Sequence, residues 1–370
     1  MRVPALVVAI AALLLITACG GGPPSDTSGQ GAGQTGSGYK KVFAAVDGLD
    51  TKQRLDKLAQ MAQKEGGQLS IYTSLTSDVE DAVSSAFEDA YDLDVSVYRA
   101  DSETVLKRLS EEHRAGFRGA DVVETNGPEL FNLNQENVLV DYRPSSLPTL
   151  VAGSKFPGWT ASRFNKFVIS WNTKLVPKGQ QPKSWEELAD PKWNGKLTLE
   201  LGDVEWYKTL FEWFRKQGKS EAQTQKIFED MARGAKITKG HTVMGELMAA
   251  GDIGVAASNY SYLVQQLEDK GAPVAWQPPV EPIISRPNGV ALVDGAKHPA
   301  TAALFEEWLL SEDGQKVLAD QRLDVARKDL ATAKGAQEIR VDLPSFIRQQ
   351  DEWTDRYERL TQLGASTGSD

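Results

Sequence analysis

The stretch that decides the fold is residues 68–126, QLSIYTSLTSDVEDAVSSAFEDAYDLDVSVYRADSETVLKRLSEEHRAGFRGADVVETN. Three short runs rich in β-branched residues alternate here with two segments whose apolar residues recur at helical spacing. The strands are predicted at 68–73, 94–99 and 120–124, and the helices begin near Ser77 and Ser102. This alternation is typical of right-handed βαβ units on a parallel sheet.

A second series of the same kind follows Phe164. Strands are predicted at 167–171, 196–201, 253–258 and 289–293, and helices after Asp203, at 242–250 and at 299–310. The sequence therefore predicts an α/β protein of two lobes with mixed sheets, helices on both faces and a hinge between the lobes. The expected divisions are lobe 1 at 50–165 and 277–325, lobe 2 at 166–276, and C-terminal helices with a loose tail at 326–370.

The N-terminus carries an export signal. Arg2 precedes an apolar run, 3–16, that is too short for a membrane-spanning helix and ends in Ile-Thr-Ala-Cys at Cys19. This resembles a bacterial lipobox, which predicts a signal peptide at 1–18 and lipidation of Cys19. The alternative is an ordinary signal peptide with a chance cysteine. Residues 19–49, rich in Gly, Ser and Pro at their start, are predicted to be a flexible tether to the membrane.

Composition argues against several other functions. Cys19 is the only cysteine, so no thiol remains for catalysis or disulfides, and the net charge of −10 argues against nucleic-acid binding. There is no GxSxG motif, and the three histidines are scattered. Acidic pairs such as Glu306-Glu307 are expected on solvated helix faces, although a glycosidase-type pair stays open. No enzyme activity and no cofactor are predicted.

A ligand site is expected where strands end and helices begin, because free N–H groups gather there. Short polar residues follow the predicted strands at five junctions: Thr73-Ser74, Asp101-Ser102, Asn126-Gly127, Gly202-Asp203 and Ser258-Asn259. Such residues suit an anionic or oxygen-rich ligand between facing lobes. The alternative is ordinary helix capping, which the same residue types favour.

Charged and aromatic residues near these junctions complete the predicted site. The candidate ligand-binding residues are Thr73, Ser74, Arg99, Ser102, Asn126, Trp206, His241, Asn259, Tyr260 and Arg286. Trp206 is expected to line the cleft because it follows a helix start, whereas Tyr207 falls on an apolar face and is expected in the core.

Five segments carry a resemblance to a known family. Residues 68–91, 99–112 and 120–133 resemble the first lobe of the periplasmic-binding-protein-like II solute receptors. Residues 167–199 are similar to the start of the second lobe in that family. The segment at 288–318, NGVALVDGAKHPATAALFEEWLLSEDGQKVL, is similar to the part in which the chain returns to the first lobe. The resemblance implies a monomeric, hinged receptor of an ABC importer that docks on a permease pair driven by an ATPase.

The branch that looks most similar is that of the ferric-ion-binding proteins, which also includes receptors for phosphorylated or phosphonate-type anions. Its ferric members usually place two adjacent tyrosines after an asparagine. In this chain the matching run is Asn259-Tyr260-Ser261-Tyr262, where a serine separates the two tyrosines. Two positions apart, they are expected on different faces of one helix. An organic or phosphorylated anion is therefore favoured over iron, with Tyr260 and Tyr262 as the metal ligands in the ferric case. A surface enzyme or sensor lipoprotein on the same fold is the third alternative.

Overall fold

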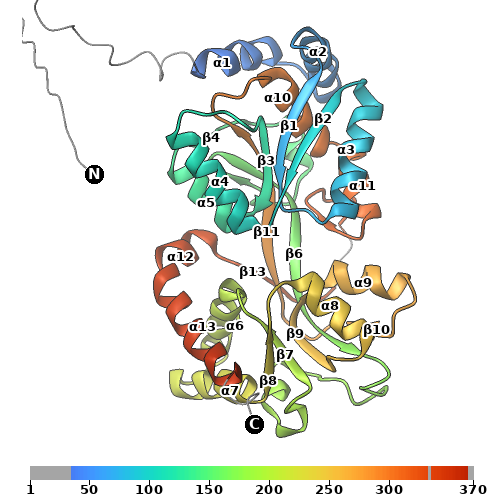
Figure 1. Cartoon of the computed structure of the whole chain (residues 1–370), viewed down its shortest axis with the longest axis vertical. Coiled ribbons are helices and arrows are strands. Elements are labelled where there is room, and N and C mark those ends of the chain that lie inside the picture. The colour runs from blue at the N-terminus through green and yellow to red at the C-terminus, as the bar shows by residue number, and fades with distance from the viewer. Residues whose placement is uncertain (1–34, 332–334, 366–370) are drawn as a thin grey trace, which may run out of the picture.

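Figure 1 shows the fold as a computed structural model, which describes residues 35–331 and 335–365. The predicted signal peptide, Cys19 and the first part of the tether lie outside these residues. Within the described ranges, no helix is long and apolar enough to cross a membrane.

Lobe 1 is built on the three parallel strands that the sequence predicted first. Strands β1 and β2 have the predicted bounds, β3 begins two residues later than predicted, and they pair in the order β2-β1-β3. Helices α3, α4, α5, α10 and α11 surround them (Figure 1). The elements of this lobe are α1 (Thr35–Val46), α2 (Thr51–Lys64), β1 (Gln68–Thr73), α3 (Ser77–Tyr91), β2 (Asp94–Arg99), α4 (Ser102–Arg114), β3 (Val122–Asn126), α5 (Gly127–Gln135), β4 (Leu139–Val140), the 3₁₀ turn Leu147–Thr149, β5 (Lys155–Phe156), α10 (Pro299–Leu309), α11 (Glu312–Asp320) and β12 (Asp324–Val325).

Lobe 2 repeats this plan around β7, which pairs in parallel with β8 and β9. Its elements are the 3₁₀ turns Glu186–Ala189 and Pro191–Trp193, β7 (Leu197–Glu200), α6 (Val204–Lys216), α7 (Glu221–Arg233), β8 (Ala235–Thr238), α8 (His241–Ala250), β9 (Val255–Tyr260), α9 (Ser261–Asp269) and β10 (Val274–Ala275). Sequence reasoning did not predict α7, which buries only Thr224, Phe228, Met231 and Ala232, nor β8, which has four residues.

Two long strands run from one lobe into the other. β6 (Trp159–Asn172) and β11 (Ile283–Val293) pair antiparallel and join both lobes in one sheet (Figure 1). Every residue of both strands is buried. The two-lobed α/β fold is therefore confirmed, and the boundary expected between residues 165 and 166 falls inside β6. The strand predicted at 289–293 is longer than expected, because β11 begins at Ile283.

Part of the predicted tether is folded. Residues 35–46 form helix α1, whose Tyr39, Val42 and Val46 side chains are buried and which contacts α2 and α10. The tether prediction is therefore wrong for this stretch. The cause is that the apolar residues of α1 are few and find their partners far along the chain, so the flanking glycines dominated the local pattern.

The C-terminal segment packs mainly on lobe 2. After β13 (Glu338–Arg340), helix α12 (Leu343–Arg348) contacts α5, and α13 (Gln350–Ala365) lies against α6, α7 and β8. Trp353 and Tyr357 bring their rings within 5.5 and 5.3 Å of the Tyr207 ring. The predicted tail from Gly364 starts too early, since residues 364–365 still belong to α13.

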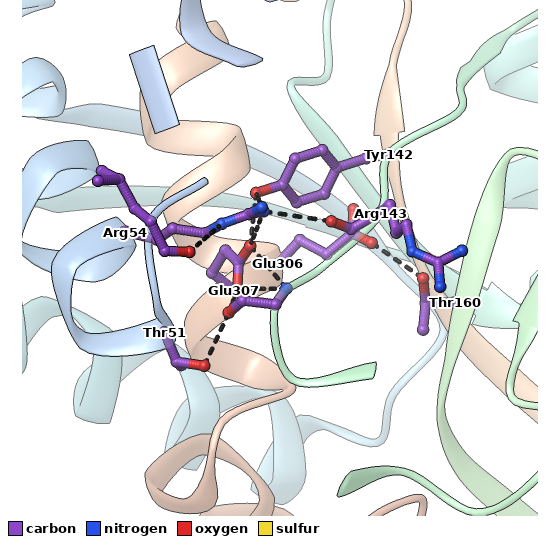
Figure 2. Close-up of polar contacts among 9 residues, drawn as sticks. Thr51, Arg54, Tyr142, Arg143, Thr160, Glu306 and Glu307 are labelled. Carbon is purple, nitrogen blue, oxygen red and sulfur yellow. Dashed lines mark hydrogen bonds and ion pairs between the residues drawn. The ribbon is translucent and has the colours of Figure 1, made fainter. Parts of the chain in front are cut away.

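Lobe 1 contains a buried acidic pair (Figure 2). Glu307 accepts hydrogen bonds from Arg54 Nη1 at 3.1 Å, Tyr142 Oη at 2.5 Å and Ser145 Oγ at 2.6 Å. Its neighbour Glu306 accepts one from Thr160 Oγ1 at 3.2 Å. The expectation that Glu306-Glu307 lies on a solvated face is wrong, because α10 is surrounded by other elements on all sides. Glu307 thereby ties α10 to α2 and to the chain after β4.

Candidate binding site between the lobes

The helices that begin between the lobes lack side-chain caps. In α3, α5, α6, α8 and α9, the side chain of the N-cap residue accepts no hydrogen bond from the N–H groups of the first turn. By contrast, α2, α7, α11 and α12 are capped by Asp50, Ser220, Ser311 and Asp342. Ordinary capping therefore explains only one of the five predicted junctions, that of α4, where Asp101 accepts from the Thr104 N–H.

Arg286 lies at the centre of the polar residues between the lobes. It extends from β11, is 5% exposed, and forms an ion pair with Glu205 in the first turn of α6. Its Nη2 donates to the Tyr260 hydroxyl at 2.8 Å and its Nε donates to Asn288 Oδ1 at 3.1 Å. The predicted residues Arg286 and Tyr260 are thus brought together. Burial raises the pKa of Tyr260, although the charge of Arg286 opposes this.

His241 stacks on the other side of this group. Its ring lies 3.6 Å from the Tyr260 ring, centroid to centroid, at an angle of 13°. Its Nε2 is 3.1 Å from Asp203 Oδ1, and Glu200 accepts from the Gly240 N–H at 2.8 Å. Burial lowers the pKa of His241 to about 4 and raises the pKa values of Glu200 and Asp203. The ring is therefore neutral at physiological pH.

Lobe 1 contributes a facing set of hydroxyl and carboxyl groups. Ser102 Oγ donates to Glu129 Oε1 at 2.9 Å, while Glu129 Oε2 is buried without a hydrogen-bond partner. Burial raises the pKa of Glu129, and the charge of Arg286, from across the lobe boundary, lowers it. Ser74 Oγ lies 2.9 Å from Thr125 Oγ1.

Thr73 belongs to a buried ion pair beside this set. It donates to Glu124 Oε2 at 3.3 Å, and Glu124 pairs with Arg163 of β6 at 2.9 Å. Both charged side chains are 3% exposed.

A pocket of about 250 Å³ opens beside Arg99 between the lobes. Its lobe 1 wall is formed by Arg99 and the start of α3, and its lobe 2 wall by residues of α8 and α9. Arg99 is exposed and donates to the Leu75 carbonyl at 2.6 Å. At the mouth, Lys270 Nζ lies 3.4 Å from Asp78 Oδ2 and links the two lobes.

The two tyrosines lie side by side, against the prediction. Tyr260 is the extended last residue of β9, with φ −78° and ψ 128°, and Tyr262 is in the first turn of α9. Their rings are 6.0 Å apart and inclined by 16°. The prediction of different faces assumed that both residues are helical, and it is wrong because the helix begins at Ser261. Burial raises the pKa of Tyr262 as well.

Three of the predicted ligand-binding residues do not contact the polar group around Arg286 in the way expected. Trp206 does not line the cleft, because it is fully buried between Trp185 and Phe228 in the core of lobe 2. Asn259 is fully buried, and its Oδ1 accepts from the Tyr260 N–H at 2.8 Å. Asn126 is half-buried and precedes α5 without capping it. Tyr207 is in the core, as predicted.

Sequence reasoning placed Asp203 at a junction without naming it as a ligand-binding residue, and it missed Glu129, Glu205 and Arg163. All four occur where local patterns indicate helix starts or a strand edge. One signal was available: Arg163 occurs shortly before an apolar run, which suggests a longer strand with a buried charge. The acids gave no such signal, since acidic residues are common in first turns.

Comparisons with known proteins agree with this architecture. Residues 120–342 match the family model described as bacterial extracellular solute-binding protein, so the chain belongs to that family. An uncharacterised protein of Haemophilus influenzae is 23% identical over 271 residues, covering 68% of this chain and 75% of that protein.

Solved structures show the same fold. Iron-bound HitA from Pseudomonas aeruginosa has a TM-score of 0.64 at 18% identity, over 79% of this chain and 99% of that one. AfuA from Actinobacillus pleuropneumoniae, with fructose-6-phosphate bound, has a TM-score of 0.62 at 20% identity, over 81% and 98%. These likenesses establish a two-lobed binding-protein fold.

Proposed function

We propose that this protein is a lipid-anchored, extracytoplasmic receptor of an ABC importer that captures a small organic or phosphorylated anion between its lobes. Cys19 would carry the anchor, and the partners would be a permease pair and its ATPase. The receptor would act as a monomer and catalyse no reaction. The family assignment supports the receptor role, and the anchor is supported by the lipobox-like sequence alone.

The observation that carries the ligand class is the set of uncapped helices between the lobes. Helices α3 and α5 of lobe 1 and α6, α8 and α9 of lobe 2 begin there without a capping side chain. Uncapped N-termini carry free N–H groups and partial positive charge, which stabilise an anion. Arg286 uses three of its donors on Glu205, Tyr260 and Asn288, and a guanidinium has five. Two donors are therefore left for an oxygen of the solute.

A ferric ion is the second candidate, and one observation favours it. Tyr260 and Tyr262 lie side by side, as two phenolate ligands of one ion must. Two features count against it: burial raises the pKa of both phenols, and the Tyr260 hydroxyl already accepts from Arg286. We therefore place the anion first.

The deciding experiment is a titration of the domain from residue 35 onward with ferric nitrilotriacetate, followed by visible absorbance. The anion proposal predicts no saturating tyrosinate-to-iron band, and a raised melting temperature with at least one member of a panel of sugar phosphates, phosphonates and carboxylates. A band that saturates at one equivalent and disappears in Tyr262→Phe would replace the anion by iron. No response to either set of ligands would contradict the choice of solute class.

A further inference from the structure

The lobe 2 wall holds a second group of side chains, which shares only His241 with the predicted anion site. Glu200 ends β7, Asp203 precedes α6 and His241 begins α8. One ligand atom from each lies within 4.8 Å of the other two. From this geometry we infer that Glu200, Asp203 and His241 form a binding site for a divalent first-row transition metal, with Zn²⁺ as the best fit.

The donor set is the first argument. One imidazole and two carboxylates suit Zn²⁺, Mn²⁺ or Fe²⁺ better than Ca²⁺ or Mg²⁺, which prefer oxygen ligands alone. Ligand distances of roughly 2.0–2.2 Å put the ligand atoms of a tetrahedral ion about 3.4 Å apart. His241 Nε2 and Asp203 Oδ1, at 3.1 Å, already meet this spacing. A pair at the 4.8 Å limit would have to close by roughly 1 Å. Three protein ligands leave a position open for water, as zinc sites of this composition commonly do.

The charge balance is the second argument. Glu200 and Asp203 are 6% and 2% exposed, and neither has a lysine or arginine within ion-pair distance in the part of the chain that the structure describes. The charge of Arg286 acts on Asp203 through space, since its ion pair is with Glu205. A bound divalent ion would give the two carboxylates a direct counter-ion.

A buried hydroxyl is the third, independent observation. Ser258 of β9 is fully buried and faces the Asp203 carboxylate, whose pKa it lowers, and its Oγ has no other hydrogen-bond partner among the described residues. A hydroxyl can accept as well as donate, so this one is also available to a metal-bound water or to the ion.

The backbone already orients the proposed ligands. Glu200 accepts hydrogen bonds from the Gly202 and Gly240 N–H groups, the latter at 2.8 Å. The His241 ring is fixed by its stacking on Tyr260. Such outer contacts hold metal ligands in place and lower the cost of ordering them. His241 is 12% exposed, which gives an ion a path from the cleft.

All three ligands belong to lobe 2, so the site does not depend on the nature of the captured solute. The test uses the domain from residue 35 onward, stripped of metal by a chelator and titrated with ZnCl₂ by calorimetry. The expected result is one equivalent bound, with a roughly tenfold or greater loss of affinity in His241→Ala and in Glu200→Gln. The matched control is His298→Ala in lobe 1, where His298 Nδ1 lies 2.9 Å from Asp121 Oδ2 without a third ligand.

Circular dichroism of each variant guards against loss of folding, and Glu200→Gln keeps the shape of the side chain. Binding that is equal in wild type, His241→Ala and Glu200→Gln would place the zinc elsewhere and overturn the inference. So would the absence of any binding of Zn²⁺, Mn²⁺ or Fe²⁺ by the wild type. Loss of zinc affinity in His298→Ala alone would do the same.

Discussion

One buried network of charged side chains surrounds Glu307 inside lobe 1, and another surrounds Arg286 between the lobes. In the first, both carboxylate oxygens of Glu307 are used by donors from Arg54, Tyr142 and Ser145 (Figure 2). In the second, Glu129 Oε2 and the amide nitrogen of Asn288 are buried without partners. A satisfied network stabilises a fold, whereas open donors and acceptors are available to a ligand.

Glu306 is an exception to this contrast between the two networks. Glu306, next to Glu307, has an unpartnered Oε2 although it lies inside lobe 1. Burial raises the pKa of Glu306 to about 8, so this side chain is neutral at and below neutral pH. The cost of leaving it unpaired is therefore reduced by a bound proton rather than by a partner.

The largest effect on stability should come from the network around Glu307. Glu307→Ala leaves Arg54 and Tyr142 without their buried acceptor, and we expect a loss of roughly 3–5 kcal/mol in the free energy of unfolding. Urea denaturation would measure it. Glu307→Gln, which keeps an acceptor oxygen, should lose less. Solute affinity should be unchanged in both, and a stability loss below about 1 kcal/mol would mean that the network is not structural.

Glu306 should give the next largest effect, through pH. Its folded pKa of about 8 exceeds the ordinary value of 4.5, so the folded state holds a proton that the unfolded state releases between these values. Stability then falls as pH rises through this window, by up to a few kcal/mol, relative to Glu306→Gln. Urea titrations of both proteins at pH 5 and pH 8 would show it. Parallel behaviour of the two proteins would contradict the raised pKa.

The smallest effect on stability should come from the network around Arg286. Tyr260→Phe removes the acceptor of Arg286 Nη2 but keeps the ring that stacks on His241, so we expect about 1 kcal/mol of lost stability. Solute affinity should fall roughly tenfold, which corresponds to about 1.4 kcal/mol.

The matched control is Tyr207→Phe. This hydroxyl donates to Gln225 Oε1 at 3.2 Å in the core of lobe 2, so stability should fall by a similar amount without loss of affinity. Thermal melting and calorimetry would measure both variants. Equal affinity in Tyr260→Phe and Tyr207→Phe would remove the distinction between the two networks.

Much of the fold could be predicted from local patterns. The strands at 68–73 and 94–99 were predicted with the observed bounds, and α5 begins at the predicted junction Asn126-Gly127 with Pro128 in its first turn. Helix α1 was missed because glycines dominate its sequence neighbourhood, and its few apolar residues are buried only by packing on α2 and on the distant α10.

The site was predicted in part. The junction rule found Ser74, Ser102 and Tyr260, which contribute to the facing walls, but it also selected Trp206, which packs in the core. A residue in the first turn of a helix can face either the cleft or the core. Trp206 lies in the core because the buried face of α6 is wide enough to include it.

By itself, the sequence determined the alternation of strands and helices, the two lobes and the junctions where helices begin, because these follow from hydrophobic period and turn chemistry within short windows. Only the tertiary structure decided what each charged side chain does. Arg286 meets Glu205 across 81 positions and Tyr142 meets Glu307 across 165. Burial and partner identity set the role of a charge, and both arise from contacts between residues far apart in the chain.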